Sequence, residues 1–248
     1  MPTLSLITIC RNSSGTLART LDSVASQSVR PKEYIFVDGG SQDGTLELLA
    51  SRLPDLREQG IDARVVSQGE HPGEAGIPHA WNLGLGLCHG EVIGLLNSDD
   101  WYDDGVLEAV VQAFDGNSEV GGVSVPVQLW SPEGGKSGIL RPGSLSALSW
   151  KMAVPHPGCF FRRRVYEVLG KYDTRYKIAA DYDFIWRCRQ AKVVWQYLSS
   201  PAVNMQAGGL ANSSRAPARR ETLQIARKYI PWSPVPFLAY FARLLLGK

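Results

Sequence analysis

Four aspartates stand close together where an apolar stretch ends, in the segment GEVIGLLNSDDWYDD that spans residues 90–104. They are Asp99, Asp100, Asp103 and Asp104, and the segment contains no basic residue. Carboxylates crowded in this way repel one another. Their charge must therefore be compensated by a metal ion, by a basic side chain from elsewhere in the chain, or by water.

For Asp99 a metal ion is the favoured explanation. Hard cations such as Mg²⁺ and Mn²⁺ prefer oxygen ligands and usually keep water or substrate phosphates in their remaining positions. Asp103 and Asp104 directly precede the helical sequence GVLEAVVQAF. We interpret these two as first-turn acids, which the helix dipole favours.

A second pair of acids, Asp181 and Asp183, lies in IAADYDFIWR at the start of an expected helix. Acids at that position are commonly helix caps. Their apolar neighbours would also desolvate them, and a desolvated carboxylate is a better proton acceptor. The residues alone do not choose between these two roles.

The glycine-containing segment DGGSQDGT, residues 38–45, could cradle a phosphate, because glycines let backbone N–H groups approach an anion at a helix start. It matches neither the dinucleotide fingerprint GxGxxG nor the P-loop, which requires GK followed by Ser or Thr. By itself it is a weak indication.

The first hundred residues alternate between apolar β-rich runs and segments with helical spacing of apolar residues. We expect strands at 4–10, 33–40, 62–68 and 91–97, and helices at 16–28, 41–53 and 75–88. Such alternation predicts βαβ units, a mostly parallel sheet, and a ligand site at the carboxyl ends of the strands. The polar segments RNSS, DGGSQDG and NSDD all follow strands, so we expect them to converge at one edge.

The second half is less regular. We expect a strand at 119–129, a hairpin at 131–138, helices at 164–170, 179–191 and 221–230, a strand at 193–199, and a polar loop at 205–221. No linker clearly divides the chain, so we expect one domain with two lobes. The boundaries are 1–215 for the main domain, with halves 1–103 and 104–215, and 216–248 for a helical tail.

The tail PWSPVPFLAYFARLLLGK is apolar and rich in aromatic residues. It could lie in a membrane interface, or dock on the domain's own core or on a second subunit, and the sequence favours neither. No apolar run reaches the ~20 residues that span a bilayer. The N-terminus lacks the basic start of a signal peptide, so we expect a cytoplasmic protein.

The chain has 248 residues, 44% of them hydrophobic, which is enough to bury a sizeable core. Its net charge of +2 gives no general attraction to nucleic acid. The cysteines show no CxxC spacing, and we expect buried free thiols.

Taken together and in order, several segments resemble the family 2 glycosyltransferases, an inverting group with the GT-A fold. These segments are LSLITICRN, LDSVASQS, IFVDGGSQDGT, AWNLGLGLCHGEVIGLLNSDD, FFRRRVYEVLGKYD, AADYDF and AGGL. The resemblance runs from about residue 4 to residue 209 and is closest to bacterial enzymes of surface polysaccharide or glycolipid synthesis. It implies an α/β, Rossmann-like, mostly parallel central sheet flanked by helices, with a smaller C-terminal acceptor lobe and an apolar C-terminal helix.

The resemblance also implies roles for single residues. Asp99 falls at the metal-coordinating acid of the family's DXD motif, and Asp181 at the catalytic base. The residues implied to bind the nucleotide sugar are Thr8, Arg11, Asn12, Asp38, Gly40, Asn82, Asn97 and Ser98. Weaker support places His156, Asp100 and Asp183, with the glycines of AGGL, near the acceptor; His156 could equally be a packed histidine.

This sequence departs from the family pattern at several positions. Asn97 replaces the usual first Asp of DXD, Gly39 a second Asp that contacts uracil, and Arg11 a stacking aromatic residue. Glu74 and His79 also stand where relatives often have Asp. These departures leave the donor base open: UDP is expected as the commonest choice in the family, with GDP and dTDP as alternatives.

We therefore expect a transferase that uses Mn²⁺ or Mg²⁺ and moves a sugar from a nucleotide diphosphate-sugar to a saccharide or lipid-linked acceptor. Peripheral contact with the inner face of the cytoplasmic membrane is part of this expectation. Two alternatives remain: a sugar nucleotidyltransferase, and a non-catalytic protein that binds nucleotide sugars or carbohydrate. A binding protein would need no base such as Asp181, and a nucleotidyltransferase would need a basic Gly-rich loop that RNSSGTLAR barely resembles.

Overall fold

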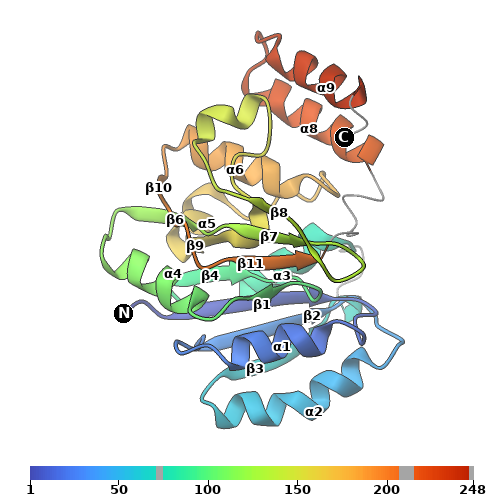
Figure 1. The fold of residues 1–248 in the computed structure, drawn as a ribbon, viewed down its shortest axis with the longest axis vertical. Helices are drawn as coiled ribbons and strands as arrows, with labels where there is room; N and C mark the ends of the chain where they lie inside the picture. Colours follow the sequence, from blue (N-terminus) through green and yellow to red (C-terminus); the bar gives the residue numbers. More distant parts are fainter. Residues whose placement is uncertain (71–74, 207–214, 246–248) are drawn as a thin grey trace.

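The computed structural model describes residues 1–70, 75–206 and 215–245 (Figure 1). Its central sheet has seven strands in the order β10-β6-β9-β4-β1-β2-β3. These strands are β1 (Leu4–Cys10), β2 (Glu33–Asp38), β3 (Asp62–Ser67), β4 (Val92–Leu95), β6 (Val120–Ser124), β9 (Cys159–Arg162) and β10 (Val194–Tyr197). Only β9 runs antiparallel to its neighbours, β4 and β6. The prediction of a mostly parallel sheet is confirmed.

Helices cover both faces of this sheet. Successive side chains of a strand point to opposite faces, and accordingly Leu6 and Ile7 of β1 belong to two different hydrophobic clusters. The face of Leu6 packs against α1 (Leu17–Ala25), α2 (Thr45–Glu58) and α4 (Val106–Asp115). The face of Ile7 packs against α3 (Ile77–Leu87), α5 (Arg163–Leu169) and α6 (Ala180–Gln190). All six residues of β2 are consequently buried, which explains its continuous apolar run.

A second sheet of four strands has the order β5-β11-β7-β8. Its members are β5 (Trp101–Tyr102), β7 (Val127–Trp130), β8 (Lys136–Leu140) and β11 (Val203–Gln206). The single strand expected at 119–129 is therefore wrong: β6 ends at Ser124 in the first sheet, and β7 begins at Val127 in the second. Pro126 lies between them, and a proline cannot donate a hydrogen bond to a sheet ladder.

Short 3₁₀ helices occupy several connections. They are η1 (Gln68–Glu70), η2 (Leu145–Ser149) and η3 (His156–Gly158). The last of these, which contains His156, leads directly into β9.

Two helices near the C-terminus, α8 (Arg215–Tyr229) and α9 (Val235–Leu245), lie side by side at the end of the molecule farthest from α2 (Figure 1). The helix expected at 221–230 thus begins earlier, at Arg215. On α8, Ile225 is buried in the same cluster as α6, and the rings of Trp186 and Tyr229 stack with centroids 5.3 Å apart. In the ranges that the structure describes, no helix has the length and apolar character needed to cross a membrane.

Candidate active site

Three loops meet at the carboxyl edge of the central sheet, as the sequence predicts. The backbone N–H of Asn12, after β1, donates to Ser41 Oγ after β2 at 2.9 Å. Asn12 Oδ1 in turn accepts a hydrogen bond from the N–H of Gln42 at 2.9 Å. The hydroxyls of Ser13 and Ser98 lie 2.8 Å apart and join the loop after β1 to the loop after β4.

Asp38 shapes the loop that follows β2. Its side chain is buried and accepts hydrogen bonds from the N–H groups of Gly40 and Ser41 at 2.9 and 3.0 Å. Gly40 has φ of +85°, a left-handed conformation that favours glycine. Gly40 is exposed, as is Arg11 in the loop after β1.

Two residues expected to bind the nucleotide sugar are occupied inside the protein, and we correct both. Thr8 is fully buried, and its hydroxyl pairs with the hydroxyl of Tyr34 at 2.9 Å. Asn82 Nδ2 donates to the carbonyl of Tyr172 at 2.8 Å, while its Oδ1 accepts from the N–H of the same residue at 2.9 Å. Both side chains hold neighbouring elements together, so neither is free for a ligand.

The segment NSDD forms a tight turn after β4. Asn97 Nδ2 donates to Asp100 Oδ2 at 2.9 Å, and the hydroxyl of Thr20 on α1 donates to the carbonyl of Asp100 at 2.8 Å. Asp100 is buried, with 1% of its surface exposed. Burial, reinforced by the adjacent charge of Asp99, raises the pKa of Asp100 to about 8. Asp99 remains partly exposed, and burial raises its pKa as well.

A basic side chain from elsewhere in the chain does reach this segment. Arg19 of α1 stacks over the ring of Trp101, 3.4 Å from its centroid, and donates to the carbonyl oxygen of Asp99 at 3.5 Å. Sequence reasoning missed Arg19, because nothing in the sequence around it indicates a contact across 80 residues. Its guanidinium contacts the backbone rather than the carboxylates, so the charge of the acids is only partly compensated.

The pair Asp99 and Asp100 fits a divalent cation. Asp100 Oδ1 is buried and has no hydrogen-bond partner in the described part of the chain. A buried carboxylate oxygen without a partner is costly, and a hard cation would satisfy it. Nowhere in residues 1–70, 75–206 and 215–245 do three or more His, Cys, Asp or Glu residues gather to hold a metal. Water and ligand oxygens would therefore complete the coordination.

The sequence predicts Asp103 and Asp104 in the first turn of a helix, and this prediction is wrong. Helix α4 begins at Val106, and its N-cap is Gly105. Asp103 instead accepts hydrogen bonds from the amide of Asn204 at 2.7 Å and the N–H of Ala202 at 3.2 Å. It therefore fastens the NSDD turn to the segment of β11.

Asp181 lies in the first turn of α6, and its Oδ1 accepts a hydrogen bond from the N–H of Tyr182 at 2.7 Å. Burial raises the pKa of Asp181 to about 6. The charge of Asp181 also acts on the thiol of Cys159, the first residue of β9. Because β9 is antiparallel to β4, Cys159 lies at the carboxyl end of β4. Asp181 is therefore within electrostatic range of the start of β9, beside the end of β4 that the NSDD turn follows.

Asp183 is not available to an acceptor, which corrects its expected role. It is fully buried and pairs with Arg187 Nε and Lys228 Nζ, each at 2.9 Å.

The sequence leaves two possible roles for His156, an acceptor contact or a packed histidine, and in the structure it is packed. Its Nε2 lies 3.0 Å from the hydroxyl of Tyr172, its ring packs on Trp81, and burial lowers its pKa to about 4. Glu74 and the glycines of AGGL lie outside the described residues.

Comparison with known proteins agrees with this geometry. The model of the family described as "Glycosyl transferase family 2" matches residues 5–170. A curated relative from Mycobacterium bovis (strain BCG / Pasteur 1173P2), "PGL/p-HBAD biosynthesis glycosyltransferase", is 30% identical over 217 residues, covering 86% of this chain and 80% of the relative. An uncharacterized glycosyltransferase from Mycobacterium tuberculosis (strain ATCC 25618 / H37Rv) is 34% identical over 194 residues, covering 75% of this chain and 68% of the relative.

Solved structures show the same fold. The structure of S. aureus TarS 1-349 in complex with UDP-GlcNAc superposes with a TM-score of 0.68 at 17% identity, over 94% of this chain and 74% of that one. This chain covers 43% of the length of a longer TarS chain. A mannosyltransferase from Pyrobaculum calidifontis in complex with GDP-Man and Mn²⁺ gives 0.69 at 20% identity, over 98% and 70% of the two chains. This chain is a transferase with the GT-A fold and belongs to glycosyl transferase family 2.

Proposed function

We propose that this enzyme transfers a sugar, of hexose type, from a nucleotide diphosphate-sugar to a hydroxyl group of a saccharide or lipid-linked acceptor, with inversion at the anomeric carbon. The observation that carries the proposal is that the charge of Asp181 reaches the start of β9, beside the end of β4 that Asp99 follows, and it supports placing both acids in one site. One acid suits a cation beside a diphosphate, and the other, with its raised pKa, suits a proton acceptor. In this proposal residues 1–103 form the nucleotide-binding half and residues 104–215 the acceptor half, and the two would meet at this edge.

In this proposal Asp181 takes the proton of the acceptor hydroxyl as that oxygen forms a bond to the anomeric carbon. The bond from this carbon to the diphosphate oxygen breaks, and its electron pair leaves with the nucleoside diphosphate. Attack on the face opposite the leaving group inverts the configuration. Mn²⁺ or Mg²⁺ bound at Asp99 would offset the charge that develops on the diphosphate.

The loops after β1, β2 and β4 are proposed to hold the nucleotide. Arg11, Asn12, Gly40, Asn97 and Ser98 are the proposed contacts that remain after Thr8 and Asn82 are set aside. Asp38 would act through the loop it shapes. UDP is the proposed nucleotide, with GDP and dTDP as alternatives; TarS and the mannosyltransferase were solved with UDP-GlcNAc and GDP-Man respectively.

We also propose that the enzyme works on cell-surface polysaccharide or glycolipid at the inner face of the cytoplasmic membrane, with α9 in the membrane interface. The buried side of α9, at Pro236 and Ala239, faces its own chain, whereas Leu238 and Phe241 on the other side are 58% and 57% exposed. A helix with such a face can lie in the boundary between headgroups and acyl chains.

The decisive test is thermal unfolding with UDP, GDP, dTDP or CDP, each in the presence of Mn²⁺, Mg²⁺ or EDTA. A ligand that binds only the folded state raises its stability by RT ln(1 + [L]/Kd), about 2.7 kcal/mol at 100 times Kd. We expect one diphosphate to raise the melting temperature when metal is present and not with EDTA. If no diphosphate does so, the proposed donor site is refuted.

A further inference from the structure

The segment Lys177–Ala179 leads directly into the helix that carries Asp181. The first N–H groups of a helix have no partner inside it, and a cap normally supplies one. Here the N-cap residue is Ala179, whose side chain cannot accept a hydrogen bond. The N–H of Tyr182 in the first turn is taken by Asp181 itself, and a carboxylate from a distant part of the chain binds the N–H of Ala179 and the two N–H groups before it.

That carboxylate belongs to Glu221 on α8. Glu221 Oε1 accepts from the N–H of Lys177 at 3.0 Å, and Oε2 accepts from the N–H groups of Ile178 and Ala179 at 2.9 and 2.8 Å. Three consecutive backbone donors thus converge on one side chain, across 42 to 44 residues of sequence. Hydrogen bonds from N–H groups to a charged acceptor are stronger than neutral ones, so the contact fixes the backbone just before Asp181.

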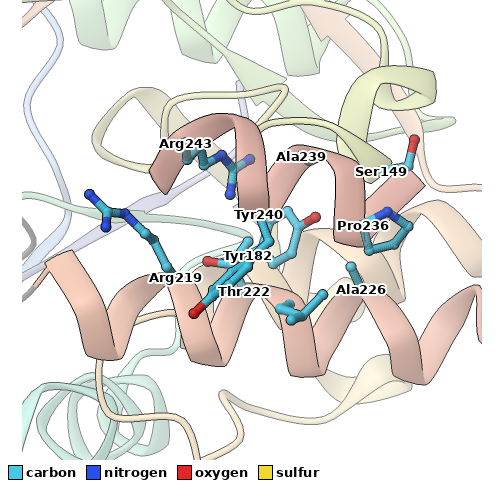
Figure 2. Close-up of a pocket in the computed structure, with 10 residues that line it drawn as sticks. Ser149, Tyr182, Arg219, Thr222, Ala226, Pro236, Ala239, Tyr240 and Arg243 are labelled. Carbon is cyan, nitrogen blue, oxygen red and sulfur yellow. The ribbon is translucent and has the colours of Figure 1, made fainter. Parts of the chain in front are cut away.

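The residue after Asp181, Tyr182, lies beside α8 and α9. Figure 2 shows the side chain of Tyr182 reaching from α6 between Arg219 of α8 and Arg243 of α9. These residues line a pocket with an empty volume of about 210 Å³, including its open mouth. The hydroxyl of Tyr182 donates to the carbonyl of Leu148. The segment before Asp181 is thus held by α8, and the residue after it lines a pocket together with residues of α8 and α9.

We propose that Glu221 positions the catalytic base: it clamps the backbone at residues 177–179 and so aims the carboxylate of Asp181 at the acceptor hydroxyl. The inference rests on the proposed function, in which Asp181 is that base. Glu221 lies beyond residues 5–170, the part of the chain that the family model matches. The C-terminal helical pair is then part of the catalytic apparatus and not only a tail.

The charges around Asp181 give this role a measurable signature. The groups that interact electrostatically with Asp181 include the carboxylate of Glu221 on α8, the phenol of Tyr172, and the thiol of Cys159 on β9. After burial, which is the largest cause, the charge of Glu221 also raises the pKa of Asp181. Removal of that charge favours the ionised form of Asp181 and so lowers its pKa.

The test compares E221Q and E221D with a control, Y229F. Tyr229 also lies on α8 and donates to Asp183 Oδ1 at 2.9 Å, so Y229F weakens the packing of α8 on α6 without affecting residues 177–179. Release of UDP from UDP-glucose and from UDP-N-acetylglucosamine, with water as acceptor, is followed against pH. The Cγ resonance of Asp181, assigned by its loss in D181N, is titrated by ¹³C NMR, and amide hydrogen exchange is measured at residues 177–179.

For E221Q we expect kcat to fall about 10- to 100-fold with an unchanged KM for the nucleotide sugar, because a misplaced group loses rate rather than binding. The midpoint of the Asp181 titration moves to lower pH, and exchange at 177–179 becomes faster. E221D keeps the charge but shortens the reach, so exchange becomes faster while the midpoint stays within a few tenths of a unit. Y229F lowers the melting temperature and leaves the midpoint and kcat unchanged.

If E221Q is folded and leaves kcat, the titration midpoint and the exchange rates as in the wild type, the positioning role is overturned. It is also overturned if Y229F reproduces all the effects of E221Q, because general packing would then explain them. The titration and exchange measurements do not depend on activity. If the titration midpoint and the exchange rates change as expected while D181N retains full activity, the proposed function fails. The contact between Glu221 and residues 177–179 would still stand.

Discussion

The hydroxyls of Ser13 and Ser98 lie 2.8 Å apart and connect the loop after β1 to the turn that contains Asp99. Ser13 is also tied to the start of α2, because its N–H donates to Thr45 Oγ1 at 2.7 Å. One residue thus links the loops that follow three strands. Direct hydrogen bonds therefore join the loops of the proposed nucleotide site.

Replacement of Asp99 tests whether this turn binds a cation with the nucleotide. In D99N we expect the metal-dependent stabilisation by a nucleoside diphosphate to disappear, because an amide is a much weaker ligand for a hard cation than a carboxylate. The measurement is the melting temperature with and without UDP and Mn²⁺. D104N is the matched control, since Asp104 is exposed and belongs to the same acidic run. Retention of the shift in D99N, or its loss in D104N, would contradict the assignment.

The pH dependence of turnover tests Asp181 as the base. Its folded-state pKa is raised to about 6, so a carboxylate that is still protonated below that pH cannot accept a proton. We expect kcat to rise with pH and to reach half its plateau near pH 6. In D181N we expect kcat to fall by roughly 10²- to 10⁴-fold, the usual contribution of a general base, while UDP binding persists. Unchanged turnover in D181N would rule out the role.

The same variant carries a prediction for stability. Because the folded state holds the proton of Asp181 more tightly than the unfolded state, this residue lowers stability as pH rises from about 4 to about 6, and its effect is constant above that. D181N removes this penalty. We therefore expect D181N to melt at the same temperature as the wild type or above it at pH 7, which scanning calorimetry can check.

Much of this fold could be predicted from local sequence patterns. The alternation of apolar strands and amphipathic helices determines the parallel sheet, and strand ends followed by polar residues indicate the edge where the loops meet. Thr8 illustrates the limit of such reasoning. It lies two residues before the end of β1, but strand alternation points its hydroxyl into the protein, toward Tyr34.

Contacts between distant residues could not be read from the sequence. Arg19 reaches Asp99 across 80 residues, and Glu221 reaches Ala179 across 42. Each residue has an ordinary local sequence, since an arginine or glutamate on a helix is most often solvated. The split at Pro126 does have a local signal, because proline interrupts a ladder of hydrogen bonds. That signal could have divided the expected strand in two.

Asp183 has a structural role, unlike the proposed base Asp181 two residues before it. It is fully buried and holds Arg187 and Lys228, so D183N leaves these two cations with a neutral partner. Loss of one member of a buried ion pair typically costs about 3–5 kcal/mol. We expect D183N to lower the free energy of unfolding by that order in urea titrations, while the midpoint of the pH–rate profile stays near 6. A variant as stable as the wild type would contradict this reading of the cluster.

The exposed face of α9 is the last feature with a direct test. Leu238, Phe241 and Leu245 recur at helical spacing and are 58%, 57% and 88% exposed. Burial of one such side chain is worth about 1.5–3 kcal/mol, so acidic residues at two of these positions should weaken membrane binding at least tenfold. We expect L238E/F241E to be lost from sedimented phosphatidylglycerol vesicles that retain the wild type. V168E is the control, because Val168 on α5 is 79% exposed and lies on a different helix. Equal binding of all three proteins would mean that α9 does not contact the bilayer, and its exposed face would then be free to pack against a second copy of the chain.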